Sequence, residues 1–388
     1  MDRKRFVGIT SAGLAGISAG VSRHTEAQGQ GFRGATDEDS GRRFVEGVIP
    51  LVSVDGTARD CGNQLGHIWR DPVHRISTVK PSYGPFIPWW REKGETRRLI
   101  DRVAPHLNDI MTGMMEGAGV KENLNGSGNI NRGGSGCTSF SVHPDLTREG
   151  RVLSGQNKDT GINRMLVYRV LRLKPTNGDG FLTVTYPGEI AGYGMSSTGM
   201  SAFRNGLYVT PPSVKGLPFD LFILLGLLCE NVDDVVEIAQ KHGVLSCGNV
   251  TFTDKNGRSA AIEFGAEKIC AVRPSDGVLA HANHPDARGM KPFEDYPPEE
   301  RKGSYRRQQR LREGLIAESG RLTAPGLFHI LSDHYGYPLS LCRHQGPVTG
   351  GINGEMATTT SIVSDNTRLR LLVTRGQPCM NLLAEYTY

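Results

Sequence analysis

A single cysteine, Cys137, stands where a glycine-rich stretch gives way to a segment typical of a β-strand. Residues 123–136 read NLNGSGNINRGGSG, a composition too polar and too rich in glycine to favour a helix or a strand. Residues 138–142 (TSFSV) and 151–157 (RVLSGQN) are β-prone and are separated by a short turn-like segment. We therefore predict a β-hairpin that places Asp159, just beyond its second strand, close to Cys137.

The rest of the chain groups strand-like and helix-like segments in blocks. Strand-like segments over 165–208 are followed by two predicted helices over 217–242, further strands over 247–281, two helices over 304–332 and a final hairpin over 358–374. This order predicts an α+β fold in which two antiparallel sheets pack together with helices outside them.

Apolar residues at helical spacing also predict one continuous helix over 97–119, with Gly119 as its C-cap. Strands at 268–273 and 278–281 are expected to extend the sheet begun by the hairpin of 247–264, and residues 281–284 are expected to close that sheet.

The composition excludes several classes of protein. With 388 residues, the chain is long enough for one large domain or two ordinary ones. The net charge of +5 is small, and no block of lysine and arginine is interleaved with aromatic residues, so nucleic acid is not an expected partner. The seven cysteines are odd in number and lack the paired spacing of a zinc site.

The first 28 residues have the composition of an export signal. A basic start, DRKRFV at 2–7, precedes a short and mildly apolar run over 8–21, and polar sequence follows. The start resembles a twin-arginine signal in which lysine takes the place of the second arginine. We predict a signal peptide over 1–28 and a periplasmic or secreted protein that makes no membrane contact after the signal is removed. The alternative is a disordered basic tail.

The motif GCTSF at 136–140, followed by GQNKD at 155–159, resembles the acyl-CoA:6-aminopenicillanic acid acyltransferase (isopenicillin N acyltransferase) family of N-terminal nucleophile hydrolases. Residues 56–66 and 116–120 are similar to other motifs of this family, and the resemblance runs from about residue 56 to the end of the chain. It implies a four-layer αββα sandwich of two antiparallel sheets.

The resemblance also implies a zymogen that cuts its own backbone between Gly136 and Cys137. Residues 29–136 would then form a small subunit, and residues 137–388 the catalytic large subunit. The two fragments are expected to stay together as a heterodimer, because a cut in a loop leaves the packed sheets unchanged.

Self-cleavage before Cys137 suits the chemistry of this residue. A cysteine thiolate attacks carbonyl carbons readily, and Gly136 leaves the preceding carbonyl unhindered. A new N-terminal cysteine also carries its own base, because its α-amino group has an unperturbed pKa of about 8 and lies close to the thiol. No catalytic histidine is then required.

The resemblance assigns roles to residues around the cysteine. Asp159 would hydrogen-bond and orient the new α-amino group, and Asn249 would supply a side-chain amide to the oxyanion hole. Gln156 and Asn157 of the same motif, and Arg306 in a basic helical segment, are candidates for binding the substrate. Related bile salt and penicillin V hydrolases have arginine at the position of Gln156, so a site that differs from theirs is expected.

Two groups of side chains invite a metal interpretation, namely His281 with Asn283 and His284, and His334 with Cys342 and His344. Each group lacks a clear third or fourth ligand at a familiar spacing. We therefore predict neither a metal site nor a cofactor.

The sequence as a whole predicts an enzyme that hydrolyses or transfers acyl groups on linear amides through an acyl-thioester on Cys137. Its expected partner is a small-molecule amide or acyl donor. One alternative is an exported binding protein that keeps the fold and is never processed. Another is a thiol peptidase that pairs Cys137 with His281 or His334.

Overall fold

The computed structural model describes residues 48–78, 94–120, 136–346 and 356–388, all of which lie in the unit Thr36–Tyr388. The predicted signal peptide and nearly all of the glycine-rich stretch before Cys137 lie outside the described residues. The signal peptide, and the expectation that the glycine-rich stretch favours neither helix nor strand, therefore stay predictions.

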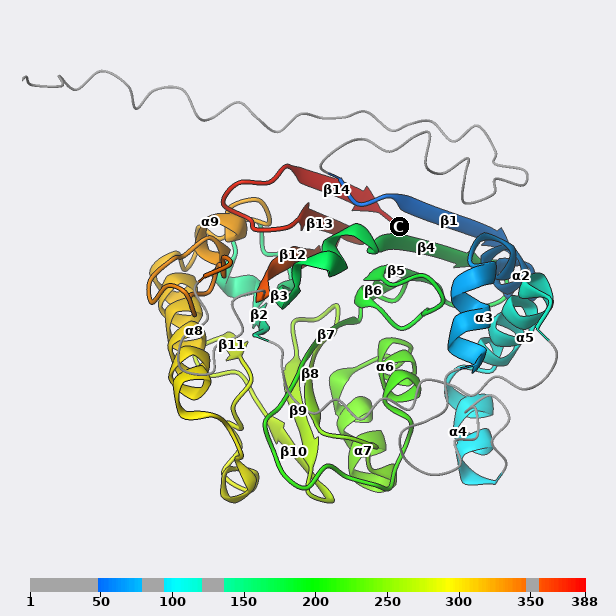
Figure 1. Ribbon diagram of the computed structural model, residues 1–388, viewed down its shortest axis with the longest axis horizontal. Coiled ribbons are helices and arrows are strands. Elements are labelled where there is room, and N and C mark those ends of the chain that lie inside the picture. Colours follow the sequence, from blue (N-terminus) through cyan, green and yellow to red (C-terminus); the bar gives the residue numbers. More distant parts are fainter. Residues whose placement is uncertain (1–47, 79–93, 121–135, 347–355) are drawn as a thin grey trace, which may run out of the picture. The chain divides into compact units, whose positions relative to one another are not determined.

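Two sheets form the centre of this unit (Figure 1). Sheet A has the strand order β1-β4-β5-β6-β7-β8-β9-β10, and sheet B the order β11-β2-β3-β12-β13-β14. Neighbouring strands are antiparallel, except that β1 and β4 run parallel. The strands of sheet A are β1 (Leu51–Gly56), β4 (Arg169–Pro175), β5 (Phe181–Thr185), β6 (Tyr193–Ser196), β7 (Ser201–Asn205), β8 (Gly248–Thr253), β9 (Ser259–Gly265) and β10 (Lys268–Val272). Those of sheet B are β2 (Thr138–Val142), β3 (Leu153–Gly161), β11 (Val278–His281), β12 (Met356–Asp365), β13 (Arg370–Arg375) and β14 (Leu383–Thr387).

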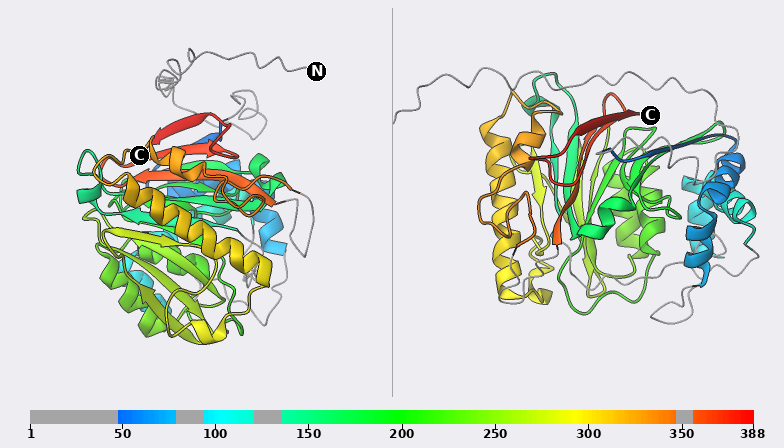
Figure 2. Two further views of the ribbon diagram at one scale, coloured as in Figure 1. Left: turned by 90° about the vertical axis from the view of Figure 1, so that its left-hand side faces the viewer. Right: turned by 45° about the horizontal axis from the view of Figure 1, so that its top comes forward.

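Helices cover the outer face of each sheet, so the unit has four layers in the order helix, sheet, sheet, helix (Figure 1 and Figure 2). The α+β fold and the αββα layering predicted from the sequence are confirmed. The helices on sheet A are α2 (Ala58–Ile68), α3 (Arg70–Thr78), α4 (Glu95–Val103), α5 (His106–Ala118), α6 (Phe219–Leu227) and α7 (Val232–His242). Those on sheet B are α8 (Pro298–Ala317) and α9 (Leu327–Leu331), and short 3-10 turns are η2 (Pro144–Leu146), η3 (Ile162–Leu166) and η4 (Lys291–Phe293).

Apolar side chains fill all three interfaces between the layers. Successive residues of a strand point to opposite faces, so one strand serves two interfaces. In β12, Ile362 packs between the two sheets, whereas Val363 packs against α8 and α9. In β5, Leu182 packs between the sheets and Phe181 against the helices on sheet A. The central strands are therefore buried on both faces, and the space between the sheets is a buried layer in which a site can form.

Two local predictions are wrong. The helix expected over 97–119 is two helices, α4 and α5, because Pro105 has no backbone N–H to continue the helical hydrogen bonding. The predicted C-cap is confirmed, since Gly119 adopts a left-handed conformation with φ of 68°.

Strand β11 does not extend the sheet of β8 to β10. It pairs with β2 in sheet B, which brings residues 278–281 beside the strand that follows Cys137.

The glycines of the motifs at 56–66 and 116–120 have a packing role. Helices α2 and α5 touch through their backbones: a Cβ added to Gly62 would lie 1.9 Å from the carbonyl oxygen of Ile110, and one added to Gly117 would lie 2.0 Å from that of Asn63. Only glycine permits this approach. Within the described part of the chain, no helix has the length and apolar character that crossing a membrane requires.

Candidate active site

Cys137 immediately precedes β2 and is fully buried. Because side chains alternate along a strand, Cys137 and Ser139 point toward sheet A, and Thr138 points toward α8. Two hydrogen bonds agree with this direction. The Ser139 hydroxyl lies 2.9 Å from the Thr251 hydroxyl of β8, and Arg307 of α8 donates to the Thr138 hydroxyl at 3.2 Å. The thiol therefore lies in the layer between the two sheets.

A lysine is the hydrogen-bond partner of the Cys137 sulfur. Nζ of Lys158 donates to Sγ at 3.4 Å, and it also lies 5.1 Å from the centre of the Tyr193 ring. Burial acts to lower the pKa of Lys158. The negative charge that Cys137, Tyr193 and Tyr168 can carry has the opposite and larger effect, so the pKa is raised overall. The lysine is therefore an ammonium placed to stabilise a thiolate at Cys137.

Sequence reasoning missed Lys158, although the residue is part of the GQNKD motif. The register of the hairpin could have identified Lys158 as the neighbour of Cys137. Thr138 lies opposite Asn157 in the pairing of β2 with β3, so the residue before Thr138 and the residue after Asn157 meet across the hairpin. Cys137 and Lys158 are that pair.

Replacing Lys158 with methionine, which keeps the length of the side chain, is expected to slow alkylation of Cys137 near neutral pH about tenfold or more. A hydrogen bond to a charged group is worth about 1.5–3 kcal/mol, and the thiolate loses it in this variant. Peptide mass spectrometry of protein treated with iodoacetamide for increasing times gives the rate at Cys137 alone. Lys241→Met, at an exposed position in α7, is the matched control. Equal rates in the two variants would contradict the role of Lys158.

Asp159 lies against the peptide that precedes the cysteine. A Cβ added to Gly136 would lie 2.7 Å from Oδ2 of Asp159 and 2.9 Å from Nη1 of Arg343, so a larger residue would displace the ends of these two side chains. Oδ1 of Asp159 accepts a hydrogen bond from the Thr358 hydroxyl at 2.8 Å. Oδ2 has no hydrogen-bond partner among the residues that the structure describes, although Asp159 is fully buried.

The charge of Asp159 is balanced by basic groups from distant parts of the chain. Burial raises the pKa of the Asp159 carboxyl to about 6, against the lowering effect of Arg307 and Arg343. Arg307 also donates to Oδ1 of Asn283 at 2.7 Å, and Arg343 donates to Glu300 at 3.4 Å. At neutral pH the carboxylate is thus ionised, and it becomes protonated as the pH falls through about 6.

Asn249 lies in β8 on the face of sheet A that is turned toward sheet B. Its Nδ2 donates to the Thr251 hydroxyl over 3.5 Å, a long distance for a hydrogen bond, and its Oδ1 has no partner among the described residues. Thr251 in turn contacts Ser139, two residues after Cys137. The amide of Asn249 therefore shares the buried layer of the thiol and keeps donor capacity for a ligand.

Gln156 and Asn157 point to opposite sides of sheet B. Nε2 of Gln156 donates to the Arg204 carbonyl at 2.7 Å and to Oδ1 of Asn205 at 2.8 Å, which ties β3 to β7 in the layer of the thiol. Asn157 faces the helices instead. It donates to the carbonyls of Leu331 and Leu341, both at 2.9 Å, and accepts a hydrogen bond from Ser361 at 2.6 Å. Both the nitrogen and the oxygen of the Asn157 side-chain amide are thus hydrogen-bonded within the protein, as in a structural residue.

The structure does not bring Arg306 to the cysteine. Arg306 lies on the outer side of α8, where it donates to the Gly336 carbonyl at 3.3 Å and stacks over Tyr335 at 5.9 Å. Its neighbour Arg307 is the arginine that points inward, toward Thr138. A substrate-binding role for Arg306 finds no support in these contacts.

The sequence model of the acyl-coenzyme A:6-aminopenicillanic acid acyl-transferase family matches residues 146–351, which is more than half of the 388-residue chain. The chain belongs to this family. Asp159 and Asn249 lie within the matched span, and Cys137 lies just before it. As predicted from the sequence, the protein is an enzyme of the N-terminal nucleophile amidohydrolase and acyltransferase type.

One solved structure with a similar chain is a mutant of the conjugated bile acid hydrolase from Clostridium perfringens. Its sequence is 13% identical, the alignment covers 65% of this chain and 97% of that chain, and the TM-score is 0.41. The N-acylethanolamine-hydrolyzing acid amidase ortholog from Caenorhabditis elegans has 11% identity, coverages of 60% and 93%, and a TM-score of 0.39. Penicillin V acylase from Agrobacterium tumefaciens has 13% identity, coverages of 66% and 78%, and a TM-score of 0.33. Similarities this low assign no activity. No curated protein matches the sequence.

Among the described residues, Cys137 pairs with neither His281 nor His334. Both ring nitrogens of His281 are engaged, one 2.7 Å from Glu263 and the other 2.9 Å from the Ala282 carbonyl. Burial acts to lower the pKa of His281, but the hydrogen bond to Glu263, the charges of Glu263 and Asp286 and the hydrogen bond to Ala282 together raise it by more, so that the pKa is raised overall. His334 contacts His344 at 3.1 Å. The sulfur of Cys137 has Lys158 beside it, and the thiol peptidase alternative is not favoured.

Proposed function

We propose that this enzyme is made as a precursor that cleaves its own backbone between Gly136 and Cys137, and that the freed Cys137 then carries the acyl group of an amide substrate as a thioester. Asp159 would hold the new α-amino group, and Lys158 would stabilise the thiolate. Asn249 would donate a hydrogen bond to the developing oxyanion.

The observation that carries this proposal is the position of Asp159. A fully buried carboxylate oxygen without a partner among the described residues is costly, and this one lies beside Gly136, next to the peptide bond that would be cut. Cleavage would create an ammonium group on Cys137 at this place. The ammonium and the carboxylate would then form the buried ion pair for which Oδ2 is positioned.

Self-cleavage would take two steps. In the first, Sγ of Cys137 bonds to the carbonyl carbon of Gly136, the C–N bond breaks, and the thiol proton ends on the departing nitrogen of Cys137. The product is a thioester between the Gly136 carbonyl and the Cys137 side chain. In the second step water attacks this thioester, which releases the Gly136 carboxylate and regenerates the thiol.

Turnover repeats this chemistry on an external amide. The α-amino group has taken the proton of the Cys137 thiol and is the ammonium beside Asp159. The Cys137 thiolate attacks the substrate carbonyl, and the amine leaves with a proton from that ammonium. Water then hydrolyses the acyl-thioester. An amine that takes the place of water would give acyl transfer from the same intermediate. A signal peptide over 1–28 would place the enzyme outside the cytoplasm, where water is the acceptor at hand.

The rate of self-cleavage is expected to fall as the pH falls through about 6, because Asp159 becomes protonated there and no longer attracts the forming ammonium. Well below this value the rate should approach a tenfold loss per pH unit. Uncut chain purified under denaturing conditions and refolded at a series of pH values gives the rate from the appearance of fragments. A rate without a decrease on the acid side would exclude Asp159 as the partner of the ammonium.

Trapping of the acyl-enzyme tests the proposal that Cys137 carries the acyl group of an amide substrate as a thioester. Penicillin V, a conjugated bile acid and an N-acylethanolamine cover three kinds of acyl amide, and a denaturing acid quench preserves a thioester. Intact mass should increase by the acyl group on wild-type protein with at least one amide of a broader N-acyl panel, and peptide mapping should place the increase on Cys137. Turnover without any adduct on Cys137, or an adduct that persists in Cys137→Ala, would contradict the mechanism.

A further inference from the structure

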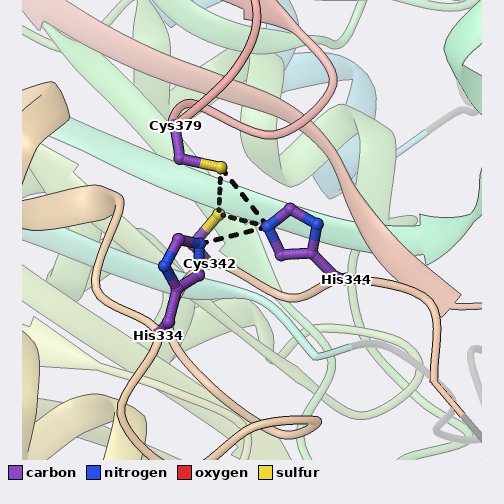
Figure 3. Close-up of side chains that lie close together, drawn as sticks. All are labelled: His334, Cys342, His344 and Cys379. Carbon is purple, nitrogen blue, oxygen red and sulfur yellow. Dashed lines mark hydrogen bonds between the residues drawn. The ribbon is translucent and has the colours of Figure 1, made fainter. Parts of the chain in front are cut away.

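Four metal-binding side chains that the catalytic site does not use point toward one another (Figure 3). They are His334, Cys342, His344 and Cys379, and one ligand atom of each lies within 4.8 Å of those of the other three. The first three belong to the segment between α9 and β12, and Cys379 belongs to the turn between β13 and β14. The prediction of no metal site was made without Cys379, because it stands 35 residues beyond His344.

Four of the six separations between the ligand atoms fit the edges of a tetrahedron around zinc, and the other two, from His334 to the sulfurs, are within 4.8 Å. With Zn–S of about 2.3 Å and Zn–N of about 2.0–2.1 Å, a tetrahedral site has S···S of about 3.8 Å, S···N of about 3.6 Å and N···N of about 3.3 Å. The two sulfurs lie 3.6 Å apart, and Nε2 of His344 lies 3.5 Å from Cys342 Sγ and 3.3 Å from Cys379 Sγ. The two Nε2 atoms lie 3.1 Å apart. Each of these four separations is within about 0.3 Å of the tetrahedral value.

Hydrogen bonds among the four side chains explain this arrangement less well than a bound cation does. Nε2 of His344 contacts three possible ligand atoms, those of His334, Cys342 and Cys379 (Figure 3). A ring nitrogen carries either one proton or one lone pair, so it can make one of these contacts as a hydrogen bond. A cation at the centre satisfies all four ligand atoms at once.

We propose that His334, Cys342, His344 and Cys379 bind one zinc ion as a closed structural site. Two thiolates and two imidazoles in tetrahedral geometry select zinc, and four protein ligands leave no open position for catalysis. The ion would fasten the turn after β13 to the segment between α9 and β12. Arg343 lies between two of the ligands and reaches Gly136, so the zinc would also fix the backbone from which this arginine extends.

Metal analysis of the purified full-length protein tests the proposal directly. Protein without an affinity tag, grown with added zinc, is expected to hold about one zinc ion per chain after dialysis. Replacement by Co²⁺ should give the intense visible bands of tetrahedral cobalt and a near-ultraviolet thiolate charge-transfer band. A metal content near zero, together with a cobalt spectrum of octahedral type, would overturn the proposal.

Variants then locate the ion. Cys379→Ser and His334→Ala change exposed residues and are expected to lose the bound zinc and the cobalt charge-transfer band, with a lower unfolding temperature. Cys270→Ser and His329→Ala are matched controls, because these residues lie outside the cluster and should leave the metal content unchanged. Zinc retained in both cluster variants would refute the assignment. Uncut Cys137→Ala protein serves equally well, so failure of self-cleavage does not affect the test.

A disulfide between Cys342 and Cys379 is the alternative to zinc binding by these two residues. It would need a sulfur separation of about 2.05 Å and an oxidant that takes two electrons. Peptide mapping under denaturing, non-reducing conditions separates the cases. Cys342 and Cys379 recovered as free thiols after removal of the metal support the zinc site, and a Cys342–Cys379 disulfide in freshly purified protein would rule it out.

Discussion

Replacing Cys137 with alanine is expected to abolish both cleavage of the chain and turnover of every amide substrate. Cys137 is the nucleophile of both reactions in this account, and removing a nucleophile costs about 10⁴-fold or more in rate. The variant should still fold, because the thiol is a small buried group whose loss leaves both sheets intact. Gel electrophoresis shows cleavage, and release of free amine measures turnover.

Cys229→Ala is the matched control for this variant. Cys229 is also buried, and its sulfur contacts the Leu225 carbonyl at 3.3 Å in the helical layer on sheet A. This variant is expected to be cut and active. Cleavage that continues in Cys137→Ala would assign the nucleophile to another residue.

Asp159→Asn is expected to lower the rates of self-cleavage and turnover by about 10²–10⁴-fold. Asparagine keeps the oxygen that accepts the hydrogen bond of Thr358, so the substitution removes charge with little change in shape. Removing one partner of a buried charge pair costs about 3–5 kcal/mol, which corresponds to this loss of rate. The rates of fragment formation after refolding and of amine release measure the two effects.

Asp145→Asn is the control, because Asp145 lies in the same hairpin with an exposed side chain. Its rates should equal those of the wild type. If Asp159→Asn were cut and active at wild-type rates, the buried carboxylate would have a structural role only, and its free oxygen would need another explanation.

The local part of the site could be predicted from the sequence, since a hairpin is a local structure. The turn between β2 and β3 fixes the register, and the register brings Cys137, Lys158 and Asp159 together. The arginines could not be found in the same way. Arg343 comes from the segment before β12, and sheet order, which depends on contacts distant in sequence, brings it to Gly136.

Arg307, which the sequence analysis does not name, could have been identified from a signal that was available. One residue along a helix turns the side chain by about 100°. The buried residues of α8 are Gly303, Ser304, Arg307, Leu311 and Leu315, which follow helical spacing. Arg307 lies on this stripe, and Arg306 does not. Helical periodicity alone therefore favours Arg307 as the inward residue.

The measurement that tests the central claim most directly is intact mass together with N-terminal sequencing of the purified wild-type protein. The account predicts two fragments, of which the larger begins at Cys137, and a single uncut chain for Cys137→Ala analysed beside it. An uncut wild-type chain that hydrolyses amides, or a wild-type fragment that begins at any other residue, would contradict cleavage at this bond.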